Sequence, residues 1–255
     1  VLDSTAFFGF IANGIAQVGG APPTAVSDAS YDAWIGATDG SGGLYYPKGG
    51  LTGFLLDVLI RDASNNHGSL DQVMRSLYDA TYKRGRGFTP ADWWGEASRV
   101  AGGKSFSEFA RRYVDGREPL PIDSVLRLAG LRSRTDTTRE PRLGIQTATD
   151  TGGVAITQIN AAGAAGAAGA QLGDRIVSIG DFTITNDDSF AGFRSRYSGT
   201  AAPTLPMVVR RGGQTITLQL PMRLFPSVNT TVTPIPNAPE KAVRIRNGIM
   251  RGSTS

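Results

Sequence analysis

The sequence predicts a multidomain α plus β chain, in which a helical part precedes a β-rich part. Up to about residue 131, apolar residues recur every three or four positions, which is the spacing of amphipathic helices. From about residue 141 to 222 they alternate with polar residues, and glycine and proline divide the segment into short runs. A chain of 255 residues is long enough for two domains of ordinary size.

Helices in the first part are predicted from apolar stripes and from their start signals. Ser69 followed by Gln72 has the pattern of a capping box, and Thr89 before a proline suits a capped helix start. Pro121 is expected to begin a short helix that Gly130 ends. Two stripes carry the helical spacing: Leu51, Phe54, Leu55, Val58 and Leu59 in one, and Leu70, Val73, Met74, Leu77 and Tyr78 in the other.

The second part has the alternation of short strands. Met207 to Ile216 is predicted to form a hairpin that turns at Gly212, and the strand continues through Leu220. Residues 188–198 fit a short helix between strands. The Ala/Gly run from Ala161 to Ala170 is interpreted as a short Ala-rich helical turn.

These patterns divide the chain into four segments. Residues 1–131 form the helical part, 132–140 a polar linker, and 141–224 the β-rich domain. Residues 225–255 are expected to be an extended tail with a terminal helix over 240–250.

The composition argues against several classes of partner. The net charge is +4, but the arginines are spread along the chain, so neither a nucleic-acid interface nor a charged membrane surface is expected. No transmembrane span is predicted. A looser basic cluster is interpreted as solvated linker; it consists of Arg127, Arg132, Arg134, Arg139 and Arg142.

Cysteine is absent and His67 is the only histidine of the sequence. Zinc sites are usually built from Cys and His with some carboxylates, so this chain is expected to hold no zinc and no other cofactor. A lone histidine in a loop is most simply a solvated residue. The lack of cysteine does not identify the compartment.

A binding loop is predicted where Gly144 lies between Leu143 and Ile145, just ahead of a strand. Glycine at such a position lets successive backbone N–H groups point outward, where they can hold a carboxylate. A peptide could then add as a strand beside residues 145–149 and lie against the 188–198 helix. The alternative is the same fold without a ligand, acting as a spacer or packing against another domain.

This second part resembles PDZ domains of the bacterial protease-associated type. The resemblance depends on Arg142-Leu143-Gly144-Ile145, on Gly153-Val154-Ala155-Ile156, and on the signature Ala168-Gly169-Ala170-Gln171-Leu172-Gly173-Asp174-Arg175-Ile176-Val177-Ser178-Ile179-Gly180. It implies a C-terminal peptide as a partner. Ala170 replaces the usual leucine of the signature.

The first part resembles zinc aminopeptidases with a thermolysin-like catalytic fold, and within them the PDZ-containing glycyl aminopeptidases. The matching segments are Ser30-Tyr31-Asp32-Ala33-Trp34-Ile35, Leu44-Tyr45-Tyr46-Pro47-Lys48-Gly49-Gly50, Ser69-Leu70-Asp71-Gln72-Val73-Met74 and residues 106–121. The resemblance implies that residues 1–131 are the helical C-terminal half of such a catalytic domain. It also implies peptide substrates with N-terminal Gly or Ala.

By the same resemblance, Tyr46 is the catalytic tyrosine. Its phenol would donate a hydrogen bond to the oxygen on which negative charge grows when water attacks a peptide carbonyl. The neighbouring Tyr45 is the alternative, and a core tyrosine ahead of a helix is the simpler interpretation of Tyr46. Lys48 has no assigned role beyond support of the motif.

The family's His-Glu-x-x-His motif and its further Glu ligand do not occur in this sequence. In the family they lie upstream, so the chain is expected to be a fragment whose partner is the missing N-terminal part with its zinc. Alone it is expected to be inactive. The competing hypotheses are a non-catalytic helical plus PDZ module that binds peptides, and a chaperone-like periplasmic adaptor. The PDZ-protease resemblance favours a periplasmic or secreted location.

Overall fold

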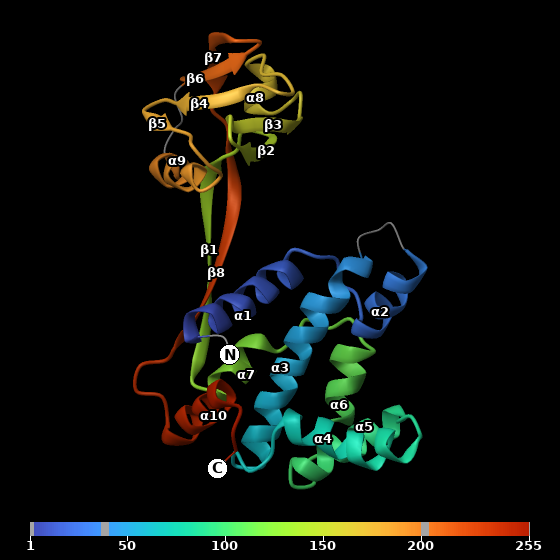
Figure 1. The fold of residues 1–255 in the computed structure, drawn as a ribbon. Helices are drawn as coiled ribbons and strands as arrows, with labels where there is room; N and C mark the ends of the chain where they lie inside the picture. The colour runs from blue at the N-terminus through green and yellow to red at the C-terminus, as the bar shows by residue number, and fades with distance from the viewer. Residues whose placement is uncertain (1–2, 37–40, 200–203, 255) are drawn as a thin grey trace. The chain divides into compact units, whose positions relative to one another are not determined.

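The computed structural model describes residues 3–36, 41–199 and 204–254 (Figure 1). The chain divides into two compact units, a helical one made of residues 1–135 and 230–255 and a β-rich one made of residues 136–229. The predicted fold class, helices followed by a PDZ-like β-rich domain, is confirmed. None of the described helices is long and apolar enough to span a bilayer.

The helical unit is arranged around one central helix, α3, Tyr45–Ala63. Its residues Leu55, Val58 and Ile60 are completely buried. Leu55 and Val58 belong to the apolar stripe predicted from the sequence, and Ile60 does not. Helices packed into the same core include α1 (Ser4–Gly19), α4 (Leu70–Ala80), α5 (Pro90–Val100), α7 (Ile122–Leu128) and α10 (Glu240–Arg251), while α2 (Val26–Ile35) and the short α6 (Ser107–Phe109) complete the unit.

The helix starts follow the predicted signals. The Ser69 hydroxyl accepts a hydrogen bond from the Gln72 N–H, and the Gln72 side-chain oxygen accepts one from the Ser69 N–H, which closes the capping box of α4. Thr89 caps α5 in the same reciprocal way with Asp92, and Pro90 is the first residue of that helix.

The C-terminal segment belongs to the helical unit and is not a separate tail. Arg61 of α3, only 2% exposed, pairs with Asp57 at 2.8 Å and donates to the carbonyl of Ser253 and to Asn66. Gly248 of α10 lies against this guanidinium, since a Cβ there would approach Arg61 Nη1 to 2.8 Å. The predicted terminal helix is confirmed, and the buried arginine fixes its end.

The linker prediction for residues 132–140 is corrected by the structure. These residues lie within β1 (Leu131–Pro141), which pairs with β8 (Leu224–Pro234) as a two-stranded ribbon. Cross-strand contacts such as Thr135 to Thr230, at 3.0 Å between hydroxyls, accompany the pairing. A polar sequence suffices here because most β1 side chains are exposed and the strand is held by its backbone partner.

The β-rich unit is a sheet in the order β2-β3-β4-β6-β7, with β5 paired to β4. Its interior is apolar, with Val154, Ile156, Ile179, Met207 and Leu220 almost entirely buried. The strands are β2 (Ile145–Asp150), β3 (Gly153–Ile159), β4 (Arg175–Ile179), β5 (Phe182–Thr183), β6 (Thr204–Arg211) and β7 (Gln214–Pro221).

Two short helices complete this unit, α8 (Ala164–Ala167) and α9 (Ser189–Tyr197). The first confirms the helical turn predicted in the Ala/Gly run, and the second the helix predicted over 188–198. The predicted hairpin is also present, since Val209 pairs with Ile216 in β6–β7 and Gly212 and Gly213 turn the chain with φ of 55° and 83°.

Candidate functional site

A groove of about 700 Å³ lies between β2 and α9 in the β-rich unit. Apolar side chains contribute much of its lining: Leu143, Ile145, Ile159, Phe190 and Phe193. Polar and charged residues also line it, including Glu140, Arg142, Thr147 and Arg194. The three predicted loop residues, Leu143, Gly144 and Ile145, are thus together at this groove.

The loop at one end of the groove presents donors rather than acceptors. The carbonyl of Leu143 accepts the Ala165 N–H at 2.9 Å, and the carbonyl of Gly144 accepts the Asn160 N–H at 2.8 Å. In the described part of the chain, no protein acceptor takes the N–H of Leu143 or Gly144. Since both carbonyls are engaged inside the domain, the N–H groups are the ones left for an anion such as a carboxylate.

Glycine is required at position 144 by the backbone conformation and by close packing. Its φ is +74°, which disfavours any residue with a Cβ, and a Cβ there would lie 2.9 Å from the Cα of Gly163. The Ala/Gly run therefore supplies the small surface against which the loop is packed. This explains why glycine is needed at both positions.

Strand β2 forms the other long wall and is an edge strand. Among the described strands it pairs with β3 alone, in antiparallel register from Ile145 opposite Ile159 to Asp150 opposite Gly153. A register shift falls between Gln146 and Thr147. An edge of this kind offers unpaired backbone groups to which an extended peptide can add as a further strand.

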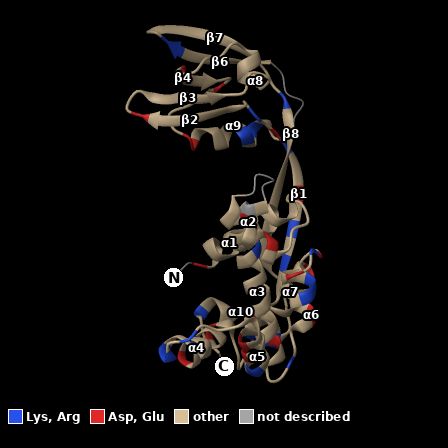
Figure 2. Cartoon of the chain, turned by 90° about the vertical axis from the view of Figure 1, so that its right-hand side faces the viewer, with Lys and Arg blue, Asp and Glu red and all other residues tan. Residues whose placement is uncertain are grey.

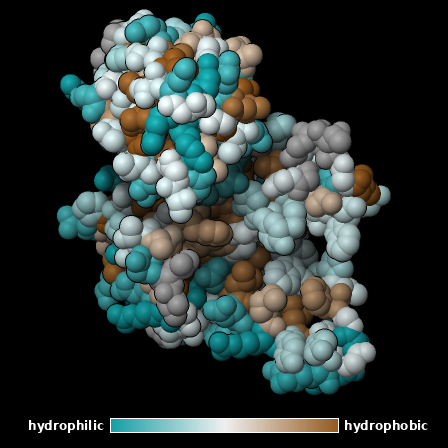
Figure 3. All heavy atoms as spheres, turned by 45° about the horizontal axis from the view of Figure 1, so that its top comes forward, coloured by the Kyte–Doolittle hydropathy of each residue, from teal (hydrophilic) through white to brown (hydrophobic). Residues whose placement is uncertain are grey.

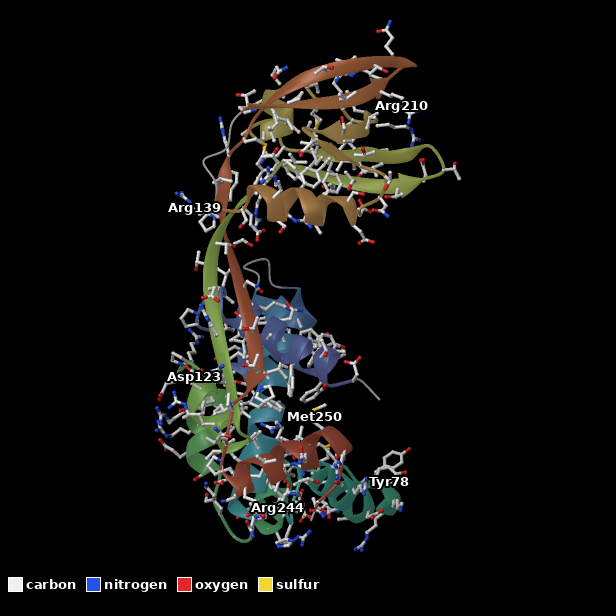
Figure 4. All side chains as sticks on the ribbon, turned by 90° about the vertical axis from the view of Figure 1, so that its left-hand side faces the viewer. Tyr78, Asp123, Arg139, Arg210, Arg244 and Met250 are labelled. Carbon is white, nitrogen blue, oxygen red and sulfur yellow. The ribbon has the colours of Figure 1, made fainter. Side chains whose placement is uncertain are left out.

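Helix α9 runs back along the groove towards the loop. Just before it, Asp187 accepts hydrogen bonds from Thr147 at 2.7 Å and from Thr149 at 3.3 Å, which ties its start to the later part of β2. After its end, the Gly199 N–H donates to the carbonyl of Arg139 at 2.7 Å, shortly before the loop (Figure 4). The helix is thus antiparallel to β2.

Tyr46 lies in the first turn of α3 and is 74% exposed, so the alternative of a core tyrosine is wrong. Its ring centroid is 4.0 Å from that of Tyr45, and hydrogen bonding to Tyr46 raises the pKa of Tyr45. On the nearby α2, Tyr31 and Trp34 are also exposed. Figure 3 shows apolar side chains open to solvent on the helical unit.

Lys48 has a structural place that the sequence left open. It is buried, and its ammonium group donates to the backbone carbonyl of Thr24, ahead of α2. Burial lowers the pKa of Lys48. The Lys48 side chain therefore holds the segment before α2 against the start of α3, where Tyr46 also lies.

The described residues offer no metal site: nowhere among them do three His, Cys, Asp or Glu side chains gather so that a metal ion could be held. His67 lies exposed in the loop between α3 and α4. Tyr46 and the loop at 143–145 belong to different units.

Sequence reasoning missed two features of the groove. The first is Arg194, for which the one available signal is that it follows Phe190 by four residues and so shares its helix face. The contact between Asp187 and Thr147 joins residues 40 apart in sequence and carries no local signal.

Residues 141–222 match the PDZ domain family. A crystal structure of an aminopeptidase N family protein from Idiomarina loihiensis is similar over 95% of this chain, with 18% identity and a TM-score of 0.58. This chain covers 44% of that protein's chain. The search of curated proteins found no match.

Two further structures are also similar. The HtrA3 PDZ domain bound to a phage-derived ligand (FGRWV) matches 39% of this chain and 92% of its own, at 17% identity and a TM-score of 0.28. The HtrA-type protease AlgWS227A with decapeptide matches 40% of this chain and 32% of its own, at 19% identity and a TM-score of 0.30. The chain thus contains a PDZ domain, and its helical unit with that domain shares the fold of an aminopeptidase N family protein.

Proposed function

We propose that this chain is the PDZ-bearing C-terminal part of a zinc aminopeptidase, and that its groove between β2 and α9 binds the C-terminal segment of a peptide. The observation that carries the binding function is the combination of an edge strand, an apolar groove, and a loop whose carbonyls are hydrogen-bonded inside the domain, so that its N–H groups are left for a ligand. The resemblance of residues 30–121 to glycyl aminopeptidases and the fold likeness support the peptidase part.

Binding follows from the geometry of the groove. The peptide's terminal carboxylate accepts hydrogen bonds from the N–H groups at Leu143 and Gly144, each a charge-assisted bond. Its backbone pairs with the open edge of β2, and its last side chain fills the apolar part lined by Phe190 and Phe193. Backbone pairing gives affinity without sequence preference, whereas the apolar part selects the last residue.

The catalytic role belongs to Tyr46. Its exposed phenol can reach a substrate bound outside this chain's core, and its O–H would donate to the oxyanion of the tetrahedral intermediate. The residues described here do not fit a zinc site, so the metal and its ligands are assigned to the rest of the protein. Exposed Tyr31, Trp34 and Ile35 on α2 suit coverage by that missing N-terminal part.

Peptide binding is tested with the chain as it stands. A fluorescent peptide ending in valine should bind as the free acid and lose most of its affinity as the C-terminal amide, because the amide removes the charge that the loop recognises. Equal affinity of acid and amide would overturn the proposed use of the loop.

The peptidase role is tested in the longer protein with Gly- and Ala-arylamides, with and without a chelator. Tyr46→Phe should lower kcat by about 10²–10³-fold, as loss of one oxyanion donor does, while Tyr45→Phe is the matched control. A Tyr46→Phe enzyme with full kcat would contradict the assignment.

A second candidate is a non-catalytic peptide-binding module, which is favoured by the fact that all groove residues named above belong to this chain. Reading the residues encoded upstream of Val1 separates the two functions, since an upstream His-Glu-x-x-His motif supports the peptidase.

A further inference from the structure

The groove has more positive charge than a single terminal carboxylate requires. Arg142 and Arg194 line it together with one acidic residue, Glu140. Within the described part of the chain neither arginine forms an ion pair, whereas Arg175 and Arg211 of the same unit are paired with Asp150 and Asp174.

The two arginines come from different elements, and both line the groove. Arg142 directly precedes Leu143, and Arg194 lies on α9 one helical turn beyond Phe190, on the face that lines the groove. Because α9 runs back towards Arg139 and the loop, Arg194 lies nearer to the loop than Phe190 does.

Acidic residues lie outside the groove lining, at the other ends of its two walls. Asp187 and Asp188 directly precede α9, and Asp150 ends β2. Figure 2 shows this separation, with basic residues on α9 and acidic residues at the turn after β2. A peptide held along β2 with its C-terminus at the loop therefore meets positive charge at that end of the groove.

We infer that the groove selects peptides in which an acidic side chain within the last three residues adds to the terminal carboxylate. This inference rests on the proposed peptide binding at the same groove. The arginines recognise the acidic side chain, the loop N–H groups hold the terminal carboxylate, and the apolar part holds one of the last side chains. Exposed ion pairs are weak, so the preference is a matter of a few-fold and is screened by salt.

The experiment uses the 255-residue chain and fluorescence anisotropy. The reference is a labelled peptide ending in Ala-Ala-Val as the free acid, and three further peptides carry a single Glu at the last, second-last or third-last position. At least one Glu peptide should bind about threefold more tightly than the reference, and the gain should fade in about 1 M salt. Lys at the same position should weaken binding.

Arg194→Gln should weaken the Glu peptides about threefold more than it weakens the reference peptide, so that the gain is lost. Arg196→Gln is the matched control, because Arg196 is on the same helix but does not line the groove, and it should keep the gain. The inference is overturned if no Glu peptide binds more tightly, or if Arg194→Gln weakens all peptides equally.

The amide of the reference peptide distinguishes failure of the proposed carboxylate-binding loop from failure of the acidic selection. If acid and amide bind alike, the proposed use of the loop fails, and the acidic selection falls with it. If the amide binds poorly but Glu makes no difference at any position, only the acidic selection fails.

Discussion

Gly144 and Gly163 touch through their backbones: a Cβ built on either would lie 2.9 Å from the Cα of the other. The contact places the loop at 143–145 directly on the segment that precedes α8. The carbonyl of Leu143 is bonded to Ala165 in the same contact, so the direction of the loop N–H groups depends on it.

Gly144→Ala should therefore destabilise the β-rich unit by about 1–3 kcal/mol. This cost combines the strain of a left-handed backbone in a residue with a Cβ and the clash of that Cβ with the backbone of Gly163. Hydrogen exchange of β2 and β3 amides measures this, because it reports on one unit separately. Gly212→Ala is the control: its φ is also positive, at 55°, but its Cβ would meet nothing within 4 Å. Equal effects of the two substitutions would contradict the packing argument.

Asp187→Ala should weaken peptide binding while leaving stability nearly unchanged. The carboxylate ties Thr147 and Thr149 of β2 to the start of α9, and without it the groove must be ordered by the ligand, which costs affinity. The dissociation constant for the reference peptide should rise about two- to threefold, since ordering one or two side chains costs about 0.5 kcal/mol or more. Asp188→Ala is the control, because its side chain makes no capping hydrogen bond.

Much of the groove could be predicted from the sequence, because its parts are local. The loop at Gly144, the strand after it and the helix over 188–198 follow from glycine placement and apolar spacing within ten residues or so. The β1–β8 ribbon could not be found in this way, since its strands pair residues such as Thr135 and Thr230, 95 apart. A polar segment carries the same pattern whether its backbone is paired or solvated.

The same limit applies to buried charge. In the sequence, Asp174 carries no signal beyond its place in the PDZ signature, but in the structure it is 1% exposed and pairs with Arg211, 37 residues later, at 2.7 Å. The exposure of Tyr46 could not be predicted from the local sequence either, because an aromatic pair at the start of a helix occurs both in cores and on surfaces.

Because of Asp174, the stability of the β-rich unit should fall at acidic pH. The hydrogen bonds from Arg211 lower the pKa of Asp174, so the folded state favours the charged form more than the unfolded state does. Its stabilisation is full above the unfolded pKa, about 4, and is lost as the pH falls through the lower folded pKa. Hydrogen exchange of β4 amides, converted to opening free energies at each pH, should show the loss.

Asp174→Asn should remove this pH dependence and cost about 2–3 kcal/mol at neutral pH, because the buried carboxylate and its charge-assisted bonds from the partly exposed Arg211 are lost. Asp150→Asn is the control. Its pair with Arg175 is more exposed, and the loss should be smaller. If the two variants are equally stable, burial of Asp174 is not what makes its pair important.

Arg61→Met should release α10 from the helical unit. Methionine keeps much of the volume but loses the bonds from Arg61 to Asp57, Asn66 and the Ser253 carbonyl. Because breaking a buried charge pair is costly, we expect a loss of about 3 kcal/mol in unfolding free energy and faster hydrogen exchange in α10. Lys241→Met is the matched control, since Lys241 also joins α10 to α3, through Asp62 at 2.6 Å, but in a pair that is more exposed than that of Arg61. That variant should lose less than about 1 kcal/mol. Equal protection of α10 in both variants would show that apolar contacts such as those of Ile245, rather than the buried guanidinium, hold the helix in place.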